Sequence, residues 1–448
     1  MLNLDHIERI YFLGIGGIGM SALARYFAAK DYEVAGYDRN QSKICISLEN
    51  ASCHISYEDD LETIPSSFEK SENTLVVYTP AIPKTNSLLK YFTDKGHALC
   101  KRAEILGAIT RNNQCLAIAG THGKTTISSL LAYVLSDNQV DCSAFLGGIA
   151  TDFDSNLRIG SNDMAVVEAD EFDRSFLQLS PNWALISSMD ADHLDIYGTA
   201  KHLEESFQLF SDKVENGNLI AKEGLNISSK HTYALDSDTA DFSAINIRVE
   251  EGTYHFDIVY PKGICENVIT GLPGIHNVEN ALAAFAMAYF QGVSPSGIVE
   301  SIASFLGVKR RFECHVKTDH QVYIDDYAHH PKEIEVAIQS ARELYPNKEL
   351  TIIFQPHLFT RTRDFMDDFA SALSAADNVM LLGIYPAREL PIEGVNSKVL
   401  LEKITSQKKG LYSKSEFPKE ITEIEVLMTL GAGDIDVLVQ PIKKYLAS

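Results

Sequence analysis

The segment with the clearest chemical potential is Gly120-Thr121-His122-Gly123-Lys124-Thr125-Thr126, between an apolar run and a stretch with helical spacing. Successive backbone N–H groups at the start of a helix bind phosphate, because they point outward at the positive end of the helix dipole. Lys124 is expected to reach the outer phosphates of a nucleotide, and the Thr125 hydroxyl to bind Mg²⁺. The full phosphate-loop pattern has glycine at the position of Ile118, so this segment is a shortened relative of that loop.

Two acidic stretches follow this loop, each after an apolar run that predicts a strand: Glu168-Ala169-Asp170-Glu171 and Asp190-Ala191-Asp192-His193-Leu194-Asp195. Mg²⁺ prefers oxygen ligands, so Glu168 is the expected carboxylate ligand. From residue chemistry alone His193 is a weaker candidate, because imidazole is a softer donor. Asp170 and Asp173 are expected to be solvated or to support the ligands from outside.

A second glycine-rich loop, Gly14-Ile15-Gly16-Gly17-Ile18-Gly19, stands between a predicted strand and a predicted helix, and Asp38 ends the next strand. Its glycines permit close approach of a pyrophosphate, and Asp38 could bond a ribose hydroxyl. UDP satisfies this geometry as well as NAD does, so a nicotinamide-dependent dehydrogenase is a competing interpretation.

Alternating strand and helix patterns place these loops in an α/β protein of three domains. An N-terminal Rossmann-like domain is expected over 1–110, a central P-loop-type ATPase domain over 111–308, and a C-terminal Rossmann-like domain over 309–448. The strands and helices that support this division are Arg9–Leu13, 18–29, Glu33–Tyr37, Thr74–Tyr78, Gln114–Ala119, 125–135, Met164–Glu168, 183–187, 277–289, 322–325, Pro331–Leu344, Leu350–Phe354, 363–375, 379–382 and 425–430.

Composition narrows the function class. The chain has 448 residues with 39 basic and 61 acidic side chains, a net charge of -22 that would repel nucleic acid and anionic membrane surfaces. No segment approaches the roughly 20 apolar residues of a spanning helix, and the N-terminus has no signal-peptide pattern, so we expect a cytoplasmic protein without membrane insertion. Seven scattered cysteines without a C-x-x-C pair predict reduced thiols and no structural zinc site.

The order of the motifs resembles that of the Mur ligase family. Four of them cover the predicted central domain and two extend the match into the third: Gly120–Thr126, Glu168–Glu171, Asp192–Asp195, Gly274-Ile275-His276-Asn277-Val278-Glu279-Asn280, Arg310-Arg311-Phe312-Glu313 and Asp325-Asp326-Tyr327-Ala328-His329-His330-Pro331. A dehydrogenase becomes a poor interpretation, because it explains nothing after residue 110.

The resemblance implies a role for each central motif. Residues Gly120–Thr126 would bind ATP, with Lys124 and Thr125 at the phosphates and Mg²⁺, for which Mn²⁺ could substitute. Glu168 and His193 would hold the metal, and Lys124, Glu168 and His193 would be the catalytic residues. His276 and Asn280 would approach the adenine, while Arg311 and Asp326 would close over the nucleotide.

Within the family, the chain is most similar to the members that add L-alanine. Residues Gly14-Ile15-Gly16-Gly17-Ile18-Gly19-Met20-Ser21, Asp38 and Thr79-Pro80-Ala81-Ile82 would bind the UDP-sugar. Tyr327, His329, His357 and Arg361 would receive the amino acid, with Arg361 paired to its carboxylate. A metal pair at His329-His330 is a weaker alternative, because adjacent side chains on a loop diverge.

Two positions depart from patterns found among relatives. Some Mur ligases carry a carbamylated lysine where this chain has Phe207, and the L-alanine-adding members also lack that lysine. Many relatives have arginine directly after Gln-Pro-His, where this chain has Leu358. The second departure removes one expected contact to the amino acid.

The implied reaction is ATP-dependent ligation of L-alanine to the lactyl carboxylate of UDP-N-acetylmuramate through an acyl phosphate, in cytoplasmic peptidoglycan precursor synthesis. We expect a monomer or a weak homodimer. The nearest alternative is a recycling ligase that adds a preformed tripeptide to the same UDP-sugar. Folylpolyglutamate synthetase, a silent UDP-sugar-binding protein and an NAD-dependent oxidoreductase remain more distant alternatives.

Overall fold

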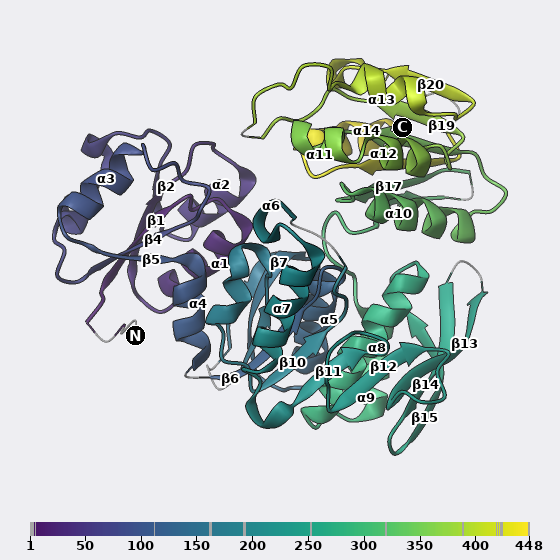
Figure 1. The fold of residues 1–448 in the computed structure, drawn as a ribbon, viewed down its shortest axis with the longest axis horizontal. Coiled ribbons are helices and arrows are strands. Elements are labelled where there is room, and N and C mark those ends of the chain that lie inside the picture. Colours follow the sequence, from purple (N-terminus) through teal and green to yellow (C-terminus); the bar gives the residue numbers. More distant parts are fainter. Residues whose placement is uncertain are drawn as a thin grey trace. The chain divides into compact units, whose positions relative to one another are not determined.

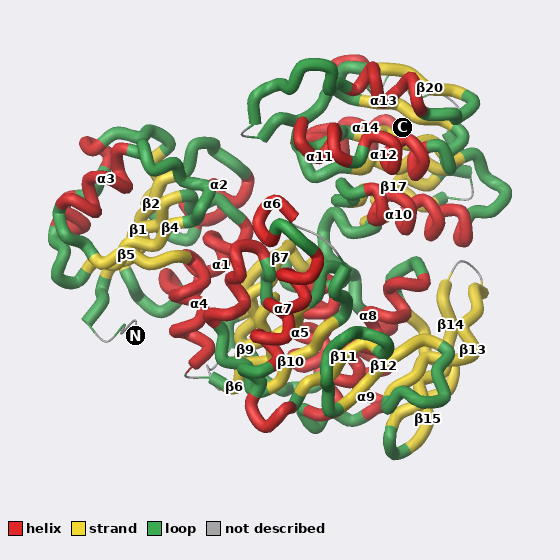
Figure 2. The backbone as a smooth tube through the Cα atoms, viewed as in Figure 1, coloured by secondary structure: helices red, strands yellow, loops and turns green. Residues whose placement is uncertain are grey.

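The computed structural model describes residues 4, 6–111, 113–160, 164–190, 194–250, 253–318, 320–387, 389–417, 419, 421 and 424–446. Their strands form three sheets, each accompanied by helices (Figures 1 and 2). The chain divides into two compact units. One contains Met1–Ile245, Asp257–Val268 and Glu279–Phe305, and the other contains Asn246–Phe256, Ile269–Val278 and Leu306–Ser448.

The first sheet is parallel and has the order β3-β2-β1-β4-β5. Its three central strands, β1, β2 and β4, are short and mostly buried, as expected inside a parallel sheet. Because β1 lies between β2 and β4, the strand order reverses there, and such a reversal opens a ligand crevice at the carboxyl ends of the strands. The elements are β1 (Arg9–Leu13), α1 (Ile18–Ala28), β2 (Glu33–Tyr37), α2 (Lys43–Asn50), β3 (His54–Ser56), β4 (Thr74–Tyr78), α3 (Ser87–Asp94), β5 (Ala98–Lys101) and α4 (Arg102–Arg111).

The second sheet has ten strands in the order β15-β14-β13-β12-β11-β10-β6-β9-β7-β8. Strand β6 pairs in parallel with both β9 and β10, so the carboxyl ends of these three strands meet at one edge. The elements are β6 (Gln114–Ala119), α5 (Lys124–Asp137), β7 (Ser143–Ala150), β8 (Ser155–Arg158), β9 (Met164–Glu168), β10 (Trp183–Ile186), α6 (Leu194–Tyr197), α7 (Ala200–Ser211), β11 (Leu219–Lys222), β12 (His231–Leu235), β13 (Phe242–Glu250), β14 (Thr253–Tyr260), β15 (Gly263–Thr270), α8 (Ile275–Phe290) and α9 (Pro295–Ser304).

The third sheet has the order β16-β17-β21-β18-β19-β20, with β16 as an antiparallel edge and the other pairs parallel. The elements are β16 (Glu313–Lys317), β17 (Val322–Asp326), α10 (Pro331–Leu344), β18 (Leu350–Phe354), α11 (Phe359–Asp364), α12 (Met366–Leu373), β19 (Asn378–Leu381), α13 (Ser397–Lys403), β20 (Lys408–Leu411), β21 (Val426–Leu430) and α14 (Val439–Leu446). Across the part of the chain that the structure describes, every helix is too short or too polar to cross a membrane.

The helix expected over 363–375 differs in the structure. It is two helices, α11 and α12, because Phe365 between them has φ -117° and ψ 25° and leaves the helical conformation. The Phe365 ring packs against the imidazole of His330 at 4.8 Å between centroids. A tertiary contact therefore accompanies the break, which local spacing does not reveal.

Candidate functional site

The loop between β6 and α5 has the shape that phosphate binding requires. Gly120 has φ +132° and Gly123 has φ +82°, conformations that side chains other than glycine rarely adopt. A Cβ atom at position 120 would lie 2.2 Å from Ser187 Oγ, and one at position 123 would lie 2.6 Å from Asn280 Oδ1. Gly123 is the N-cap of α5, so the first amide groups of that helix open directly onto the loop.

The loop is held in place from the end of β10. Thr121 Oγ1 donates to Ser188 Oγ at 2.9 Å, and the backbone N–H of His122 donates to the same oxygen at 2.8 Å. The N–H of Asp190 donates to Thr121 Oγ1 at 3.1 Å, and the Asp190 carboxylate lies 3.2 Å from His122 Nε2. The side chains of Thr121 and His122 thus shape the loop, while Thr125 and Thr126 are buried at the first turn of the helix.

Lys124 pairs with the carboxylate of Glu171, for which the motifs predict no role. Its ammonium donates to Glu171 Oε1 at 2.9 Å, Glu171 Oε2 at 2.8 Å and the carbonyl of Gly120 at 2.6 Å. Burial alone would lower the pKa of Lys124, but Glu171, followed by Asp170 and Glu168, raises it above its ordinary value. Lys124 is therefore a protonated cation that a polyanion would meet at the helix start.

The expected metal ligands offer hard oxygen donors. Glu168 lies at the end of β9, and its Oε2 accepts from the N–H of Gly147 at 2.9 Å. A Cβ atom on Gly147 would lie 2.3 Å from both Glu168 oxygens, so that carboxylate requires a glycine beside it. A threonine hydroxyl and a carboxylate fit Mg²⁺ chemistry, with Thr125 as the hydroxyl donor. His193 lies outside the described residues.

Two residues expected near the adenine fall in different units. Asn280, on α8, is buried, and its amide oxygen faces Gly123 of the phosphate loop. His276 belongs to the other unit, where burial, opposed by Glu343 and assisted by Arg311, lowers its pKa to about 4. His276 is therefore neutral near pH 7, which suits a base edge better than a phosphate.

The glycine loop after β1 bends back against β2. Gly14 has φ +86°, and the N–H groups of Gly14 and Ile15 both donate to the carbonyl of Tyr37, at 2.7 and 3.0 Å. The N–H of Gly16 donates to Asp38 Oδ2 at 2.8 Å, so this carboxylate braces the loop itself. The expected ribose contact of Asp38 stays a prediction.

Several residues expected at the UDP-sugar are buried in the protein. Ile15, Met20 and Ser21 are at most 2% exposed. Ser21 Oγ donates to the carbonyl of Ile18 at 2.9 Å and accepts from Asn156 Nδ2, on β8, at 2.9 Å. Any direct contact of this stretch with a ligand would therefore come from the exposed side of the loop.

The Thr79-Pro80-Ala81-Ile82 segment forms a turn directly after β4. The N–H of Ile82 donates to the carbonyl of Thr79 at 3.0 Å. A Cβ atom at Gly14 would lie 2.8 Å from Thr79 Cγ2, so this turn and the glycine loop meet beside the ends of β1 and β4. The structure brings the two segments expected at the UDP-sugar together.

Two basic residues that the sequence did not single out join these loops to the acidic stretch. Arg102 Nη2 lies 3.4 Å from Asp170 Oδ2, and Lys101 Nζ lies 2.9 Å from Asp173 Oδ2. The Arg102 guanidinium also lies against Gly19, where a Cβ atom would be 2.6 Å from its Nη1. These contacts link residues about 70 positions apart, so no local pattern reveals them.

The adjacent arginines 310 and 311 have different surroundings. Arg310 Nε lies 3.3 Å from Asp325 Oδ2, and its Nη2 donates to the carbonyl of Gly431 at 2.5 Å. Among the described residues, no hydrogen bond or ion pair engages the Arg311 guanidinium, which lies 5.4 Å from the centre of the Tyr327 ring. Arg311 is thus the one of the two with donors available to a phosphate.

Both carboxylate oxygens of Asp326 accept hydrogen bonds from nearby backbone N–H groups. Its Oδ2 accepts from the N–H of Phe312 at 2.6 Å, and its Oδ1 accepts from the N–H of Ala328 at 2.7 Å. Burial raises its pKa to about 6, although Arg311 and these two N–H groups act in the opposite direction. Phe312 has φ +48°, so Asp326 braces a strained turn, and its approach to the nucleotide stays a prediction.

One cluster within the described residues has a composition that could suggest a metal site. Ligand atoms of Glu313, His315 and Asp325 lie within 4.8 Å of one another. The Arg310 guanidinium already lies 3.3 Å from the Asp325 carboxylate, and the N–H of Arg310 donates to Glu313 Oε2 at 2.8 Å. The cluster therefore has a cation of its own and holds the turn around residue 310.

The residues expected at the amino acid come together in the third sheet's unit. The His329 ring lies 5.2 Å from that of Tyr327 and 6.0 Å from that of His357, which stacks on Tyr385. His329 Nδ1 lies 3.0 Å from the Tyr327 carbonyl and 3.2 Å from Glu333 Oε2. These contacts with a backbone oxygen and a helix-cap carboxylate leave the metal-pair alternative without support.

Arg361 lies on α11, four residues after His357. It is half-buried, and no hydrogen bond or ion pair with another described residue engages its guanidinium. Leu358, the residue that departs from many relatives, has φ +71° and precedes α11. A branched side chain in that conformation indicates local strain, as binding loops often show.

Phe207, at the position of the carbamylated lysine in some relatives, is a core residue. It is fully buried on α7, and its ring lies 5.3 Å from that of Phe176 in an edge-to-face arrangement.

We expect Phe207→Leu to lower the free energy of unfolding by about 1 kcal/mol, because it replaces a close-packed ring with a smaller side chain. Urea unfolding would measure this, with half-exposed Leu209→Ala on the same helix as the control, expected within roughly 0.5 kcal/mol of the parent protein. Equal losses would contradict a core role.

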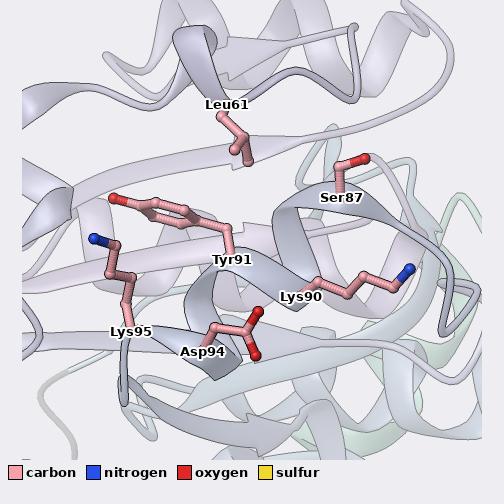
Figure 3. Close-up of a pocket in the computed structure, with 6 residues that line it drawn as sticks. All are labelled: Leu61, Ser87, Lys90, Tyr91, Asp94 and Lys95. Atoms are coloured by element: carbon pink, nitrogen blue, oxygen red, sulfur yellow. The ribbon is translucent and has the colours of Figure 1, made fainter.

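A pocket of about 480 Å³ lies beside helix α3 (Figure 3). Helix α3 lines it with Ser87, Lys90, Tyr91 and Asp94, and Leu61 faces them across the opening. None of its lining residues was expected at a substrate, and it contains only two lysines and one carboxylate as charged groups. It is not part of the candidate site.

Three family models match the chain in succession. The Mur ligase family catalytic domain covers residues 9–114, the Mur ligase middle domain covers 118–288, and the Mur ligase glutamate ligase domain covers 310–439. Together they include both glycine loops, the acidic stretch at the end of β9 and the residues around His357.

Curated relatives match over the whole length. The chain is 51% identical to a UDP-N-acetylmuramate–L-alanine ligase of Christiangramia forsetii. The alignment has a length of 450 residues and covers 100% of this chain and 99% of the relative. It is 46% identical to the protein of the same name in Parabacteroides distasonis, with 99% and 98% covered.

Solved structures give the same fold. The UDP-N-acetylmuramate-alanine ligase of Thermotoga maritima superposes with a TM-score of 0.85 at 25% identity, covering 98% of this chain and 99% of that one. A murein peptide ligase of Psychrobacter arcticus reaches 0.73 at 21% identity, covering 98% and 99%, which shows the fold alone. The three-domain α/β architecture expected from the sequence is confirmed, and the chain belongs to the Mur ligase family.

Proposed function

We propose that this chain joins L-alanine to the lactyl carboxylate of UDP-N-acetylmuramate at the expense of ATP, in peptidoglycan precursor synthesis. The observation that carries the proposal is full-length identity of 51% and 46% to two ligases of that name. The recycling ligase is less favoured, because these two full-length relatives both have the name of the L-alanine-adding enzyme.

The chemistry begins with activation of the carboxylate. A carboxylate resists attack by an amine because oxide would have to leave, so its oxygen first attacks the γ-phosphorus of ATP and releases ADP. This forms an acyl phosphate. The protein's task is alignment and charge neutralisation, for which the α5 amide groups and Lys124 are placed at the phosphate loop. When bound, Mg²⁺ would neutralise phosphate charge, with Thr125, Glu168 and His193 as its expected ligands.

The second step forms the amide bond. The deprotonated amine of L-alanine attacks the acyl carbon, and the tetrahedral adduct expels phosphate. His329 and His357, whose rings lie 6.0 Å apart, would lie near this amine. Arg361 would pair with the alanine carboxylate and orient the amine.

The reaction itself is the first test. Purified protein with ATP, Mg²⁺ and UDP-N-acetylmuramate should release phosphate when L-alanine is present. Release that instead requires L-Ala-γ-D-Glu-meso-diaminopimelate would move the protein to recycling. No release with either would leave a silent UDP-sugar-binding protein. We place the reaction in the cytoplasm, where ATP is supplied, and expect a monomer or weak homodimer on gel filtration.

Arg361→Ala should raise the KM for L-alanine by about tenfold, because a charged hydrogen bond contributes roughly 1.5–3 kcal/mol and water replaces part of it. The KM for ATP should change little. Arg363→Ala is a matched control on the same helix, since Arg363 is exposed and already lies 2.7 Å from Asp364. If both variants raise the alanine KM equally, Arg361 is not the carboxylate partner.

A further inference from the structure

We propose that Glu171 is a positioning residue that holds the Lys124 ammonium at the floor of the phosphate loop throughout the reaction. The inference rests on the proposed function, since it concerns the lysine assigned to the γ-phosphoryl group. Glu171 is fully buried, and both its oxygens accept from Lys124, at 2.8 and 2.9 Å. The third donor of the ammonium goes to the Gly120 carbonyl at 2.6 Å.

The surroundings of Glu171 hold it in place. It directly follows Asp170, whose carboxylate accepts from the N–H of Phe172 at 3.0 Å and lies 3.4 Å from Arg102. The hydroxyl of Tyr197 donates to the backbone carbonyl of Glu171 at 2.6 Å. The backbone that carries the Glu171 side chain is therefore held by contacts from Asp170 and from Tyr197.

The burial of Glu171 indicates whether Lys124 leaves this carboxylate or stays paired with it when ATP binds. If Lys124 left Glu171 completely when ATP bound, a carboxylate with no solvent exposure would lose the cation that both of its oxygens contact, and removing one partner of a buried ion pair is strongly unfavourable. Lys124 has three N–H donors, so exchanging one Glu171 oxygen for a phosphate oxygen keeps the pair intact. Glu171 thus limits the ammonium to a small range of positions, as transition-state stabilisation requires.

The charge of Glu171 predicts that nucleotide affinity and turnover change in different directions when it is removed. Glu171 places a negative charge close to where ATP brings several more, so it opposes nucleotide binding by Coulomb repulsion. Removing that charge while keeping the side-chain shape should leave nucleotide affinity unchanged or higher, yet turnover should fall because Lys124 is no longer held. A carboxylate that only stabilised the loop would affect binding and turnover in the same direction.

The experiment compares Glu171→Gln, Glu171→Asp and Asp173→Asn in the full chain. Asp173 is the matched control, because it lies in the same acidic segment, is paired with Lys101 and is 37% exposed. We measure the Kd for AMP-PNP with Mg²⁺ by calorimetry, and kcat at saturating ATP by phosphate release. The calorimetric measurement requires no turnover.

We expect Glu171→Gln to lower kcat by about tenfold or more with a Kd equal to or below that of the parent protein. Glu171→Asp keeps the charge but is one methylene shorter, so its kcat should lie between those of Glu171→Gln and the parent protein. The kcat of Asp173→Asn should stay within about twofold of the parent value.

A Glu171→Gln kcat within twofold of the parent value, or a Kd that rises along with the loss of kcat, would overturn the inference. If Glu171→Gln does not fold, a parent-like kcat in Glu171→Asp would overturn it instead. A parent protein without alanine-dependent phosphate release would contradict the proposed function, while the AMP-PNP result would still decide the effect of Glu171 on nucleotide binding.

Discussion

Lys124→Ala should lower kcat by at least ~10²-fold with ATP and UDP-N-acetylmuramate saturating, the range for loss of one preorganised electrostatic group. The physical reason is the location of Lys124, whose side chain is 13% exposed at the start of α5, beside a loop whose glycines admit a phosphate. Without Lys124, no ammonium group at this position would stabilise the negative charge that develops on the transferred phosphoryl group. Alanine-dependent phosphate release measures the effect.

The control for Lys124→Ala is Lys332→Ala, which removes an exposed lysine paired with Glu335 on α10 and should be near-normal. Removing Lys124 also takes away the cation that both oxygens of the buried Glu171 contact, so thermal unfolding of both variants must be compared. Lys124→Ala combined with Glu171→Gln removes that buried charge. If Lys124→Ala, or this double variant when the single one is unstable, turns over at a near-normal rate, the phosphate-loop assignment is wrong.

The two glycine loops were predictable because their signals are local. Gly14–Gly19 and Gly120–Thr126 each combine an apolar strand, a glycine-rich turn and a helix within about 20 residues, and the structure has all three parts in both places. The alternating pattern also predicted a parallel α/β sheet, and the observed order β3-β2-β1-β4-β5 puts the first loop at the point where the order reverses. Local spacing and general topology are sufficient for this much.

The partners of these loops were not predictable from local patterns. Glu171 was visible as an acid in the sequence, but its pairing with Lys124 joins residues 47 positions apart, and the Arg102–Asp170 contact joins residues 68 apart. Three acids stand within four positions, Glu168, Asp170 and Glu171, and only folding decides their orientations. Glu168 faces Gly147 on β7, Asp170 faces Arg102, and Glu171 turns inward.

The largest expected effect at the UDP-sugar comes from Gly16→Ala. A Cβ atom at this position would lie 2.6 Å from Cys45 Sγ and 2.9 Å from Asp38 Oδ2, closer than atoms can pack, so the loop and these two side chains must move apart. The Gly16 N–H would then lose its 2.8 Å bond to Asp38, and the amide groups that face the diphosphate would shift with it. We expect affinity for UDP-N-acetylmuramate, measured by calorimetry, to fall by roughly 10²-fold, the equivalent of one or two charged hydrogen bonds.

Gly17→Ala is the matched control for Gly16→Ala, because it adds the same methyl group one residue later on the same loop. Gly17 has φ -63°, which alanine adopts freely, and the nearest atom to its added Cβ would be the Gly14 carbonyl oxygen at 3.4 Å. Its affinity for the UDP-sugar should therefore stay within about threefold of the parent, an effect of roughly 0.5 kcal/mol. AMP-PNP affinity should be unchanged in both variants, because the second nucleotide loop belongs to a different sheet. Equal loss of UDP-sugar affinity in the two variants would show that added bulk on the loop, and not displacement of Gly16 from Asp38, weakens binding. If neither variant weakens it, the diphosphate does not bind at this loop.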